Sequence, residues 1–207
     1  MPVVAVVNPK GGVGKSTLAT NLAGYYASTG KRTMLGDFDQ QQSTRNWLDL
    51  RPAGVKPIET WAINGEIARP PRGVTHVVLD TPAQIGGKRL ADVVRVADRI
   101  VVPLQPSMFD VMATQRFLDE LRTLFASVRE FRETVGIVGM RVDTRTRAAE
   151  ELARFVGGVG LPVAGYFRDT QNYVHLAAHG LTVFDVPSQR VDKDRATWEP
   201  LLQWLGR

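Results

Sequence analysis

The chain has 207 residues, of which 43% are hydrophobic and 23% charged, as expected of one sizeable soluble α/β domain. It contains no cysteine, which excludes disulfides, iron–sulfur clusters and thiolate zinc sites and is consistent with a reducing cytoplasm. No apolar stretch is long enough to span a membrane, and the first apolar run lacks the basic leader of a signal peptide. The net charge is +5, and 20 of the 26 basic residues are arginine, a balance that permits a polyanionic partner without demonstrating one.

Short β-branched runs alternate with longer amphipathic stretches, a pattern typical of a mostly parallel, twisted sheet with helices on both faces. Prolines and a glycine between the second and third strands predict an irregular connection with room for one edge strand. No repeat or linker divides the chain, so we expect a single domain over residues 1–207. The predicted strands are 3–7, 33–37, 76–80, 99–103, 135–142 and 162–167. The predicted helices are 16–28, 42–50, 88–97, 111–125, 148–156, 172–178 and 195–205.

The first predicted strand runs into a glycine-rich turn that opens the first predicted helix. Residues 10–17 read KGGVGKST, the deviant Walker A pattern K-G-G-x-G-K-[ST], because Pro9 stands where the strict pattern has glycine. Glycines let successive N–H groups curl around phosphate oxygens, and the helix dipole favours the same anion. Lys15 can reach the β- and γ-phosphates, and the Ser16 hydroxyl can ligate Mg²⁺. We therefore expect ATP to contact Gly11, Gly12, Val13, Gly14, Lys15, Ser16 and Thr17.

Two later strands end in aspartates at the same edge of the sheet. Strand 33–37 ends in Asp37 and is followed by Asp39, and strand 76–80 ends in Asp80. An aspartate at such a strand end can hold Mg²⁺ directly or through water. Either aspartate alone could instead cap a helix or stabilise a turn. Beside the glycine-rich turn, the predicted metal ligands are Ser16, Asp37 and Asp80.

Together these motifs resemble the ParA/MinD superfamily of P-loop ATPases. The resemblance is carried by residues 10–16, by the run DFDQQ at 37–41 and by the run DTPA at 80–83, and it extends to residues 101–107 and 180–185. It therefore spans nearly the whole chain and implies a P-loop NTPase-type fold. The chain most resembles small ParA proteins without an N-terminal helix-turn-helix, because its first strand starts at Val3.

The resemblance assigns roles to the lysines and aspartates of the site. Lys10 would be the signature lysine that crosses a dimer interface to the partner's phosphates, where it would offset charge as an arginine finger does. Asp39 would orient or deprotonate the attacking water, and Asp37 would lie in the Mg²⁺ shell. The family usually has proline after this second aspartate, and Gln40 stands there instead. The catalytic set is then Lys10, Lys15 and Asp39, and a solvated loop lysine is the alternative for Lys10.

The sequence gives its weakest indication for the residues that contact adenine. In the family, the base lies near the ends of the later strands. Arg141 and the segment Phe167-Arg168-Asp169 are the candidates at those positions. A plain surface role for these residues is equally compatible with the sequence.

The resemblance implies a ParA-type positioning ATPase, which forms a homodimer with ATP, binds DNA nonspecifically and is released by hydrolysis. Dimerisation would set two basic surfaces side by side and raise the avidity for DNA. A ParB-like or other adaptor would stimulate hydrolysis and couple it to a plasmid, chromosome or other cargo, and the protein would be cytoplasmic and nucleoid-associated. Acidic residues are interleaved with the basic ones, so a patch must form in three dimensions. The candidate phosphate contacts are Arg141, Arg145, Arg147, Arg168, Arg190, Lys193 and Arg195.

Two other function classes compete with this hypothesis. A MinD-like membrane-cycling ATPase is suggested by one helical face at the C-terminus, formed by Trp198, Leu201, Leu202 and Leu205. The segment is short and contains a proline, so we expect a terminal helix that closes the core and no membrane partner. A metabolic or signalling enzyme of the superfamily is the third hypothesis, which the lack of cysteines and the dispersed tyrosines weaken.

Overall fold

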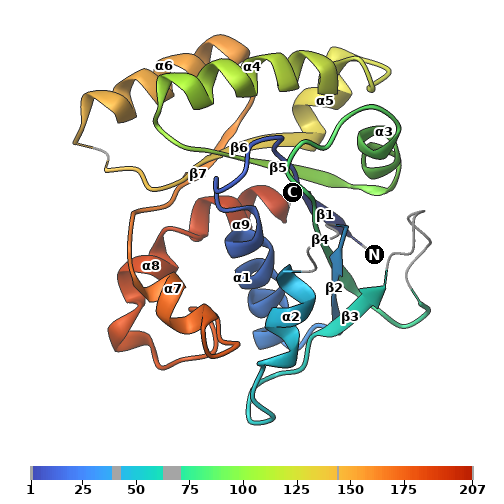
Figure 1. The fold of residues 1–207 in the computed structure, drawn as a ribbon, viewed down its shortest axis with the longest axis vertical. Helices are drawn as coiled ribbons and strands as arrows, with labels where there is room; N and C mark the ends of the chain where they lie inside the picture. The colour runs from blue at the N-terminus through green and yellow to red at the C-terminus, as the bar shows by residue number, and fades with distance from the viewer. Residues whose placement is uncertain (1, 39–42, 63–70, 144, 207) are drawn as a thin grey trace.

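The computed structural model describes residues 2–38, 43–62, 71–143 and 145–206. Its strands are β1 (Val3–Val6), β2 (Thr33–Asp37), β3 (Glu59–Ala62), β4 (His76–Asp80), β5 (Arg99–Leu104), β6 (Val135–Gly139) and β7 (Val163–Tyr166). They form one sheet in the order β3-β2-β4-β1-β5-β6-β7, and every adjacent pair is parallel. Because β1 is central, the chain first builds one half of the sheet and then the other, as in doubly wound α/β folds (Figure 1).

Helices cover both faces of this sheet. They are α1 (Lys15–Ser28), α2 (Ser43–Asp49), α3 (Gly87–Val96), α4 (Met108–Arg122), α5 (Val128–Thr134), α6 (Arg147–Val159), α7 (Asn172–Ala177), α8 (Asp192–Ala196) and α9 (Glu199–Leu205), with a short 3₁₀ turn, η1 (Ser188–Arg190). Helices α3 to α6 lie on one face, while α1, α2 and α9 lie on the other, with α7 and α8 beside them (Figure 1). The predicted α/β fold, a mostly parallel sheet between two layers of helices, is confirmed.

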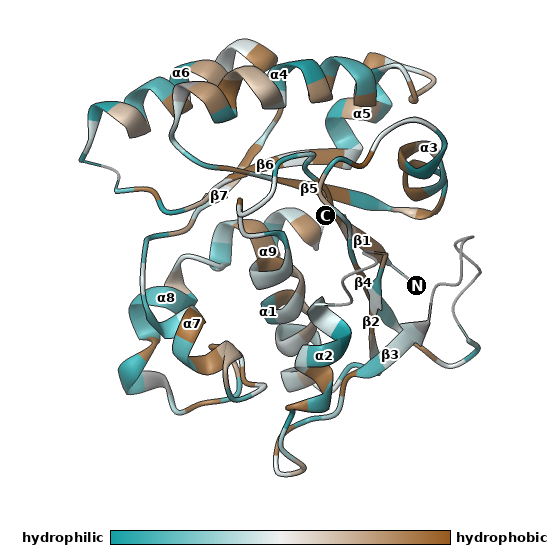
Figure 2. Cartoon of the chain, viewed as in Figure 1, coloured by the Kyte–Doolittle hydropathy of each residue, from teal (hydrophilic) through white to brown (hydrophobic). Residues whose placement is uncertain are grey.

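Side-chain alternation along the buried strands produces two hydrophobic cores. In β1, Val3 and Ala5 face the core under α3 to α6, whereas Val4 and Val6 face the core around α1. Figure 2 shows apolar residues along the central strands and on many of the helical positions that face them. Strands buried on both faces need apolar residues at nearly every position, which explains the continuous apolar runs in the sequence.

Two strand predictions meet different outcomes. The connection between the second and third predicted strands does contain an edge strand, β3, which pairs with β2 from Glu59 to Ala62. The predicted strand 135–142 is too long, because β6 ends at Gly139. Arg141 adopts a positive φ of 54°, a conformation that a side-chain-bearing residue rarely takes and that cannot continue a strand.

Two helix predictions were wrong in detail. Helix α5 was not predicted, although Ser127 caps it by accepting a hydrogen bond from the Glu130 N–H (3.1 Å), as a serine N-cap does. The single helix predicted over 195–205 is two helices, α8 and α9. Pro200 lies in the first turn of α9, where a missing N–H costs no helical hydrogen bond.

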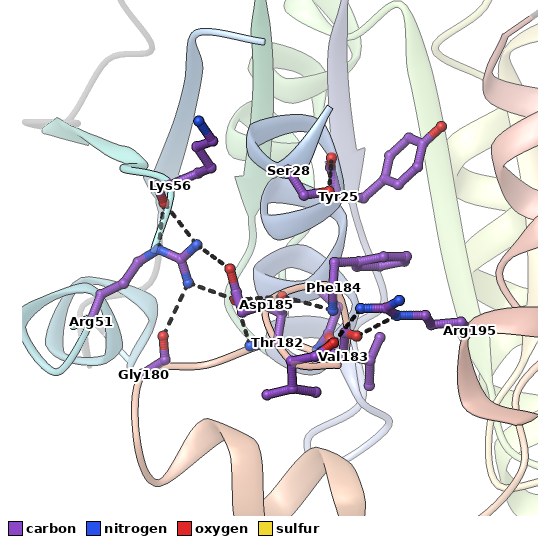
Figure 3. Close-up of polar contacts among 12 residues, drawn as sticks. Tyr25, Ser28, Arg51, Lys56, Gly180, Thr182, Val183, Phe184, Asp185 and Arg195 are labelled. Atoms are coloured by element: carbon purple, nitrogen blue, oxygen red, sulfur yellow. Dashed lines mark hydrogen bonds and ion pairs between the residues drawn. The ribbon is translucent and has the colours of Figure 1, made fainter. Parts of the chain in front are cut away.

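A loop near the C-terminus, residues 180–186, is fixed against the end of α2 by buried charge (Figure 3). Arg51 donates to both carboxylate oxygens of Asp185 at 2.9 and 2.8 Å, and the two side chains are only 6% and 3% exposed. Asp185 also accepts from the N–H and the hydroxyl of Thr182, at 2.8 and 2.6 Å. Gly180 has a φ of +67°, and a methyl group there would overlap the backbone at the end of α2. We call this loop the 180–186 segment.

The 180–186 segment also packs directly on α1. The Val183 N–H donates to the buried side-chain oxygen of Asn21 at 3.0 Å. At Gly24, a methyl group would overlap the side chain of Thr182. Helix α1 is therefore held between the sheet and this segment, which fixes the direction in which its N-terminus points.

Candidate nucleotide site

The glycine-rich turn lies at the carboxyl edge of the sheet, between β1 and α1. Strand β1 ends at Val6 between β4 and β5, and α1 starts at Lys15. The hydroxyl of Thr81, just after β4, donates to the Val6 carbonyl at 2.8 Å and ties the end of β4 to the start of the turn. This is the edge where open α/β sheets bind ligands, and it is where the sequence predicts the phosphates.

Backbone groups of the turn are held from both neighbouring strands. From the β4 side, the Gln84 N–H donates to the Pro9 carbonyl at 2.7 Å. From the β5 side, the side-chain amide of Gln105 donates to the Gly12 carbonyl at 3.0 Å. These two contacts fix the turn, and neither glutamine was predicted as a site residue. Gln105 belongs to the 101–107 run that carries part of the family resemblance, so the sequence did contain a signal for it.

The N-terminus of α1 is open to an anion. Gly14 precedes the helix with a φ of +98°, and no side chain caps the helix or places an acid in its first turn. A methyl group at Gly14 would lie 2.7 Å from the Met140 Cε atom, so this position needs glycine for both its conformation and its space. Lys15 Nζ donates to the Lys10 carbonyl at 2.7 Å, which folds the ammonium over the turn. A helix dipole and an ammonium therefore converge on one point, an arrangement that suits a phosphate.

The predicted carboxylates stand together at the neighbouring strand ends. Asp37 and Asp80 are direct register partners of β2 and β4, and Asp80 is 1% exposed. One oxygen of Asp37 accepts from the N–H and the hydroxyl of Thr44, at 2.9 and 2.8 Å. Asp37 thus stabilises the start of α2, the helix-capping role that the sequence left open, and its metal role stays a prediction. Asp39 lies outside the described residues.

This donor set fits magnesium better than a metal bound by protein alone. Among the described residues, no group of three or more His, Cys, Asp or Glu side chains could hold a metal ion. Magnesium commonly takes one or two carboxylates together with waters and substrate phosphates. The Ser16 hydroxyl in the first turn of α1 and the carboxylates at the ends of β2 and β4 offer that kind of partial shell.

Lys10 makes a contact that the sequence did not predict. Its ammonium pairs with a carboxylate oxygen of Asp110, in the first turn of α4. One hundred residues separate the two positions, and an aspartate in the first turn of a helix is an ordinary stabilising residue. Nothing in the sequence pattern therefore distinguished Asp110 from any other helix-start acid.

A cavity of about 480 Å³ opens beside the phosphate-binding turn. Val13, Gly14 and Thr17 form one wall, and residues from the ends of β6 and β7 and from α7 complete it. Its other lining residues are Met140, Arg141, Arg168, Asp169, Thr170, Gln171, Tyr173, Val174 and Ala177. Burial raises the pKa of Tyr173 to about 12, and its hydroxyl accepts from the Trp198 indole N–H at 3.0 Å, which fixes this wall to the C-terminal core. The size and position suit a purine base next to bound phosphates.

The adenine candidates divide between the cavity and the core. Arg141 lines the cavity, and its side chain lies 3.9 Å from Asp169, another lining residue. Phe167 does not line it: this residue is 1% exposed and packs edge-on against Trp198, with the ring centroids 4.7 Å apart. Side chains alternate at the end of β7, so Phe167 faces the core while its neighbour Arg168 faces the cavity.

The predicted DNA-binding arginines differ in how their charges are used. Arg145 pairs with Asp143 at 2.9 Å and lowers the pKa of that carboxyl to about 2 through its hydrogen bonds. Arg168 pairs with the buried Asp194 at 2.8 Å. Arg195 donates to two backbone carbonyls of the 180–186 segment, at 2.7 and 2.6 Å (Figure 3), so its guanidinium supports the fold. Arg147, Arg190 and Lys193 lie on α6, η1 and α8, and all three are exposed.

The C-terminal helix closes the core, as the sequence led us to expect. Trp198 and Leu201 are 0% and 1% exposed, and Leu202 and Leu205 pack against the same core around α1. Within the described residues, no helix is long and apolar enough to cross a membrane. The apolar face that suggested a membrane contact is therefore occupied by the protein's own interior.

Comparisons with known proteins agree with this geometry. Residues 4–183 match the family described as the CobQ/CobB/MinD/ParA nucleotide binding domain. Maintenance of carboxysome distribution protein A of Gloeobacter kilaueensis is 30% identical over 99% of this chain and 94% of that protein. The chromosome-partitioning ATPase Soj of Thermus thermophilus is 29% identical over 72% of this chain and 73% of that protein. The structure of apo McdA from Cyanothece covers all of both chains with a TM-score of 0.74 at 14% identity, which supports the fold.

Proposed function

Because the chain belongs to the CobQ/CobB/MinD/ParA family of nucleotide-binding domains, we propose that it is a ParA-type ATPase. It binds ATP and Mg²⁺, dimerises in the ATP-bound state, binds DNA nonspecifically and uses hydrolysis to position an intracellular cargo. One observation supports the proposal above all: the open N-terminus of α1 and Lys15 lie at the same sheet edge as the carboxylates of Asp37 and Asp80. Phosphate, metal and attacking water need those groups at one place.

The nucleotide chemistry follows from the groups at this edge. The turn and Lys15 bind the β- and γ-phosphates, and Ser16 with the strand-end carboxylates would hold Mg²⁺, which would supply positive charge beside those phosphates. Asp39 orients the attacking water, and Lys10 of the partner in the dimer stabilises the developing negative charge. The base occupies the cavity beside Arg141 and Arg168.

Nonspecific DNA binding is supported by charge and by relatedness. The net charge of +5 and the exposed basic residues at the α6, η1 and α8 side provide phosphate contacts, each of modest strength. A dimer presents two such surfaces and gains avidity without any new contact. Two relatives are named for carboxysome distribution and chromosome partitioning, so a positioning role for this chain, with an adaptor that stimulates hydrolysis, is the function we propose.

The deciding experiment measures DNA binding and lipid binding in parallel, each with ATP and with ADP. We expect the protein to retard a random DNA duplex only with ATP and Mg²⁺, and to lose that binding as salt rises. Liposome sedimentation should show no binding in either state. The Lys15→Ala variant is the negative control, and Asp39→Ala should bind DNA persistently because it binds ATP without hydrolysing it.

Three results would count against the proposal. DNA binding that is equally strong with ATP and with ADP would show that the bound nucleotide does not control DNA binding. Lipid binding without DNA binding would favour the membrane-cycling alternative. A wild-type protein that stays monomeric with ATP and hydrolyses none, even with DNA present, would contradict the ATPase assignment itself.

A further inference from the structure

The side chain of Lys10 is held by its own chain. Its ammonium pairs with a carboxylate oxygen of Asp110. The two partners are unequal: the Lys10 side chain is 42% exposed, whereas the Asp110 side chain is 3% exposed. A buried carboxylate is thus compensated by a lysine that reaches it from the surface.

The backbone of Lys10 is anchored to the same part of the fold. Its N–H donates to the side-chain oxygen of Asn8 at 2.8 Å. The Asn8 amide in turn donates to the Pro103 carbonyl at 2.7 Å and to the Thr114 hydroxyl at 3.3 Å. Asn8 and Thr114 are each 1% exposed. Both the backbone and the side chain of Lys10 are therefore tied to β5 and the first turns of α4.

If Lys10 leaves this position, the carboxylate of Asp110 stays buried without its ion-pair partner. Asp110 would keep the favourable end of the α4 dipole, but it would lose the only ion-pair partner recorded for it among the described residues. Removing one member of a buried ion pair is costly, because the remaining charge is neither hydrated nor compensated. The exposure of Lys10 lessens this cost without cancelling it.

We propose that Asp110 is a positioning residue that retains Lys10 within the monomer and thereby restrains ATP-dependent dimerisation. This inference rests on the proposed function, in which Lys10 reaches the phosphates of a partner subunit. To reach the phosphates of a second molecule, the Lys10 ammonium would have to move away from the buried Asp110 carboxylate, so each subunit would break this ion pair as the dimer forms. A triphosphate offers the ammonium several negative charges in exchange for one carboxylate, whereas the unliganded site offers none.

The first test measures whether Asp110 shields Lys10 in the full-length, nucleotide-free protein. Lysine amines are acetylated with a limiting active ester, and the rate at Lys10 is followed by peptide mass spectrometry. We expect Asp110→Asn to speed acetylation of Lys10 about tenfold, the factor that corresponds to ~1.4 kcal/mol of lost pairing. Lys31 and Lys56 in the same samples are internal references. Asp119→Asn is the matched control, because Asp119 lies on the same helix and accepts from Gln115 instead of Lys10.

The second test measures the dimer by sedimentation velocity with Mg²⁺ and ATP. Two ion pairs break per symmetric dimer, so Asp110→Asn should lower the dimer dissociation constant about 100-fold, or ~2.7 kcal/mol. The Asp119→Asn variant should match wild type. Melting by circular dichroism confirms that each variant folds, and Asp110→Ser replaces Asp110→Asn if the latter does not.

The two readouts separate the inference from the function on which it rests. Faster acetylation with a tighter dimer supports the inference. Unchanged acetylation of Lys10 overturns it, and so does faster acetylation with a dimer that is equally tight or weaker. If no protein dimerises with ATP at any concentration, the proposed function fails, and the acetylation rates still decide whether Asp110 holds Lys10.

Discussion

The two regions that contact α1 use polar groups in opposite ways. At its N-terminus, the phosphate-binding turn has a helix end without a side-chain cap and a lysine, Lys15, whose ammonium donates to the Lys10 carbonyl. Along its side, the 180–186 segment contains a buried arginine–aspartate pair whose groups are saturated by one another and by nearby carbonyls. The first region is arranged to receive an anion from outside, whereas the second completes its own interactions.

The two regions therefore have different expected roles: the phosphate-binding turn serves ligand binding, and the 180–186 segment serves stability. Both regions resemble ParA proteins at the level of sequence, so resemblance alone does not say which one acts on a ligand. A buried pair that satisfies itself stabilises only when both partners are present. An open helix end contributes little until its ligand arrives. Substitutions in the two regions should therefore give separable defects, in affinity or in stability.

Lys15→Ala should produce the largest effect on nucleotide affinity and little effect on stability. The variant loses the cation that neutralises the phosphates, and a charged hydrogen bond of about 1.5–3 kcal/mol corresponds to a weakening of roughly 10- to 150-fold. Its melting temperature should stay within a few degrees of wild type. Isothermal titration calorimetry with Mg²⁺ and ATP gives the affinity, and an unchanged dissociation constant would show that the phosphates bind elsewhere.

Arg51→Ala should give the reverse defect. It leaves Asp185 buried and uncompensated, which costs about 3–5 kcal/mol of unfolding free energy and should lower the melting temperature by roughly 10 °C. ATP affinity measured well below that temperature should be unchanged. Arg129→Ala is the matched control: it removes an exposed pair with Glu133, in which the arginine side chain is 85% exposed, and should leave the melting temperature close to that of wild type. Equal melting temperatures for the two variants would remove the contrast between the regions.

Gln105→Ala should give an intermediate defect on the nucleotide side. The side chain fixes the Gly12 carbonyl, and one neutral hydrogen bond is worth about 0.5–1.5 kcal/mol, or roughly two- to tenfold in ATP affinity. Gln115→Ala, which removes a hydrogen bond to Asp119 on α4, is the control and should bind ATP as wild type does. A Gln105→Ala variant with full affinity would mean that the turn needs no support from β5.

The smallest expected effect is on the pH dependence of stability, at the C-terminal end of α1. Burial, reinforced by the charge of Lys31, lowers the pKa of His76, whose ring lies 4.4 Å from that of Tyr26. The unfolded chain therefore takes up this proton more readily than the folded one, so stability is full above the unfolded value near ~6.5 and declines as pH falls through it. Urea unfolding at pH 7.5 and 5.5 should show this loss, and His76→Gln should reduce it. An identical pH dependence in the variant would assign the loss to other groups.

Much of the nucleotide edge could be predicted because its residues are close in sequence or end adjacent strands. The turn at 10–17 is contiguous, and the parallel arrangement brings Asp37 and Asp80 into register. Helix α5 was also legible in principle, since Ser127 and Glu130 have capping-box spacing. Its seven residues were too few to produce a convincing helical period.

Other features depend on tertiary context that no local pattern contains. The pairing of Lys10 with Asp110 joins the turn after β1 to the first turn of α4, the helix that follows β5 in the chain. The positive φ of Arg141 shortens β6, and only glycine would have signalled it in the sequence. Phe167 was a candidate for the base, but strand alternation places it in the core, one position away from a residue that lines the cavity.

Because Gly24 has no side chain, α1 and the 180–186 segment can pack in direct contact. The Thr182 side chain lies so close to the α1 backbone that a methyl group at Gly24 would collide with it, as in a closely packed protein interior. Any side chain at position 24 would therefore have to displace Thr182, whose hydroxyl donates to Asp185 at 2.6 Å. Through one glycine, the packing of α1 thus depends on the same buried Arg51–Asp185 pair that fixes the 180–186 segment.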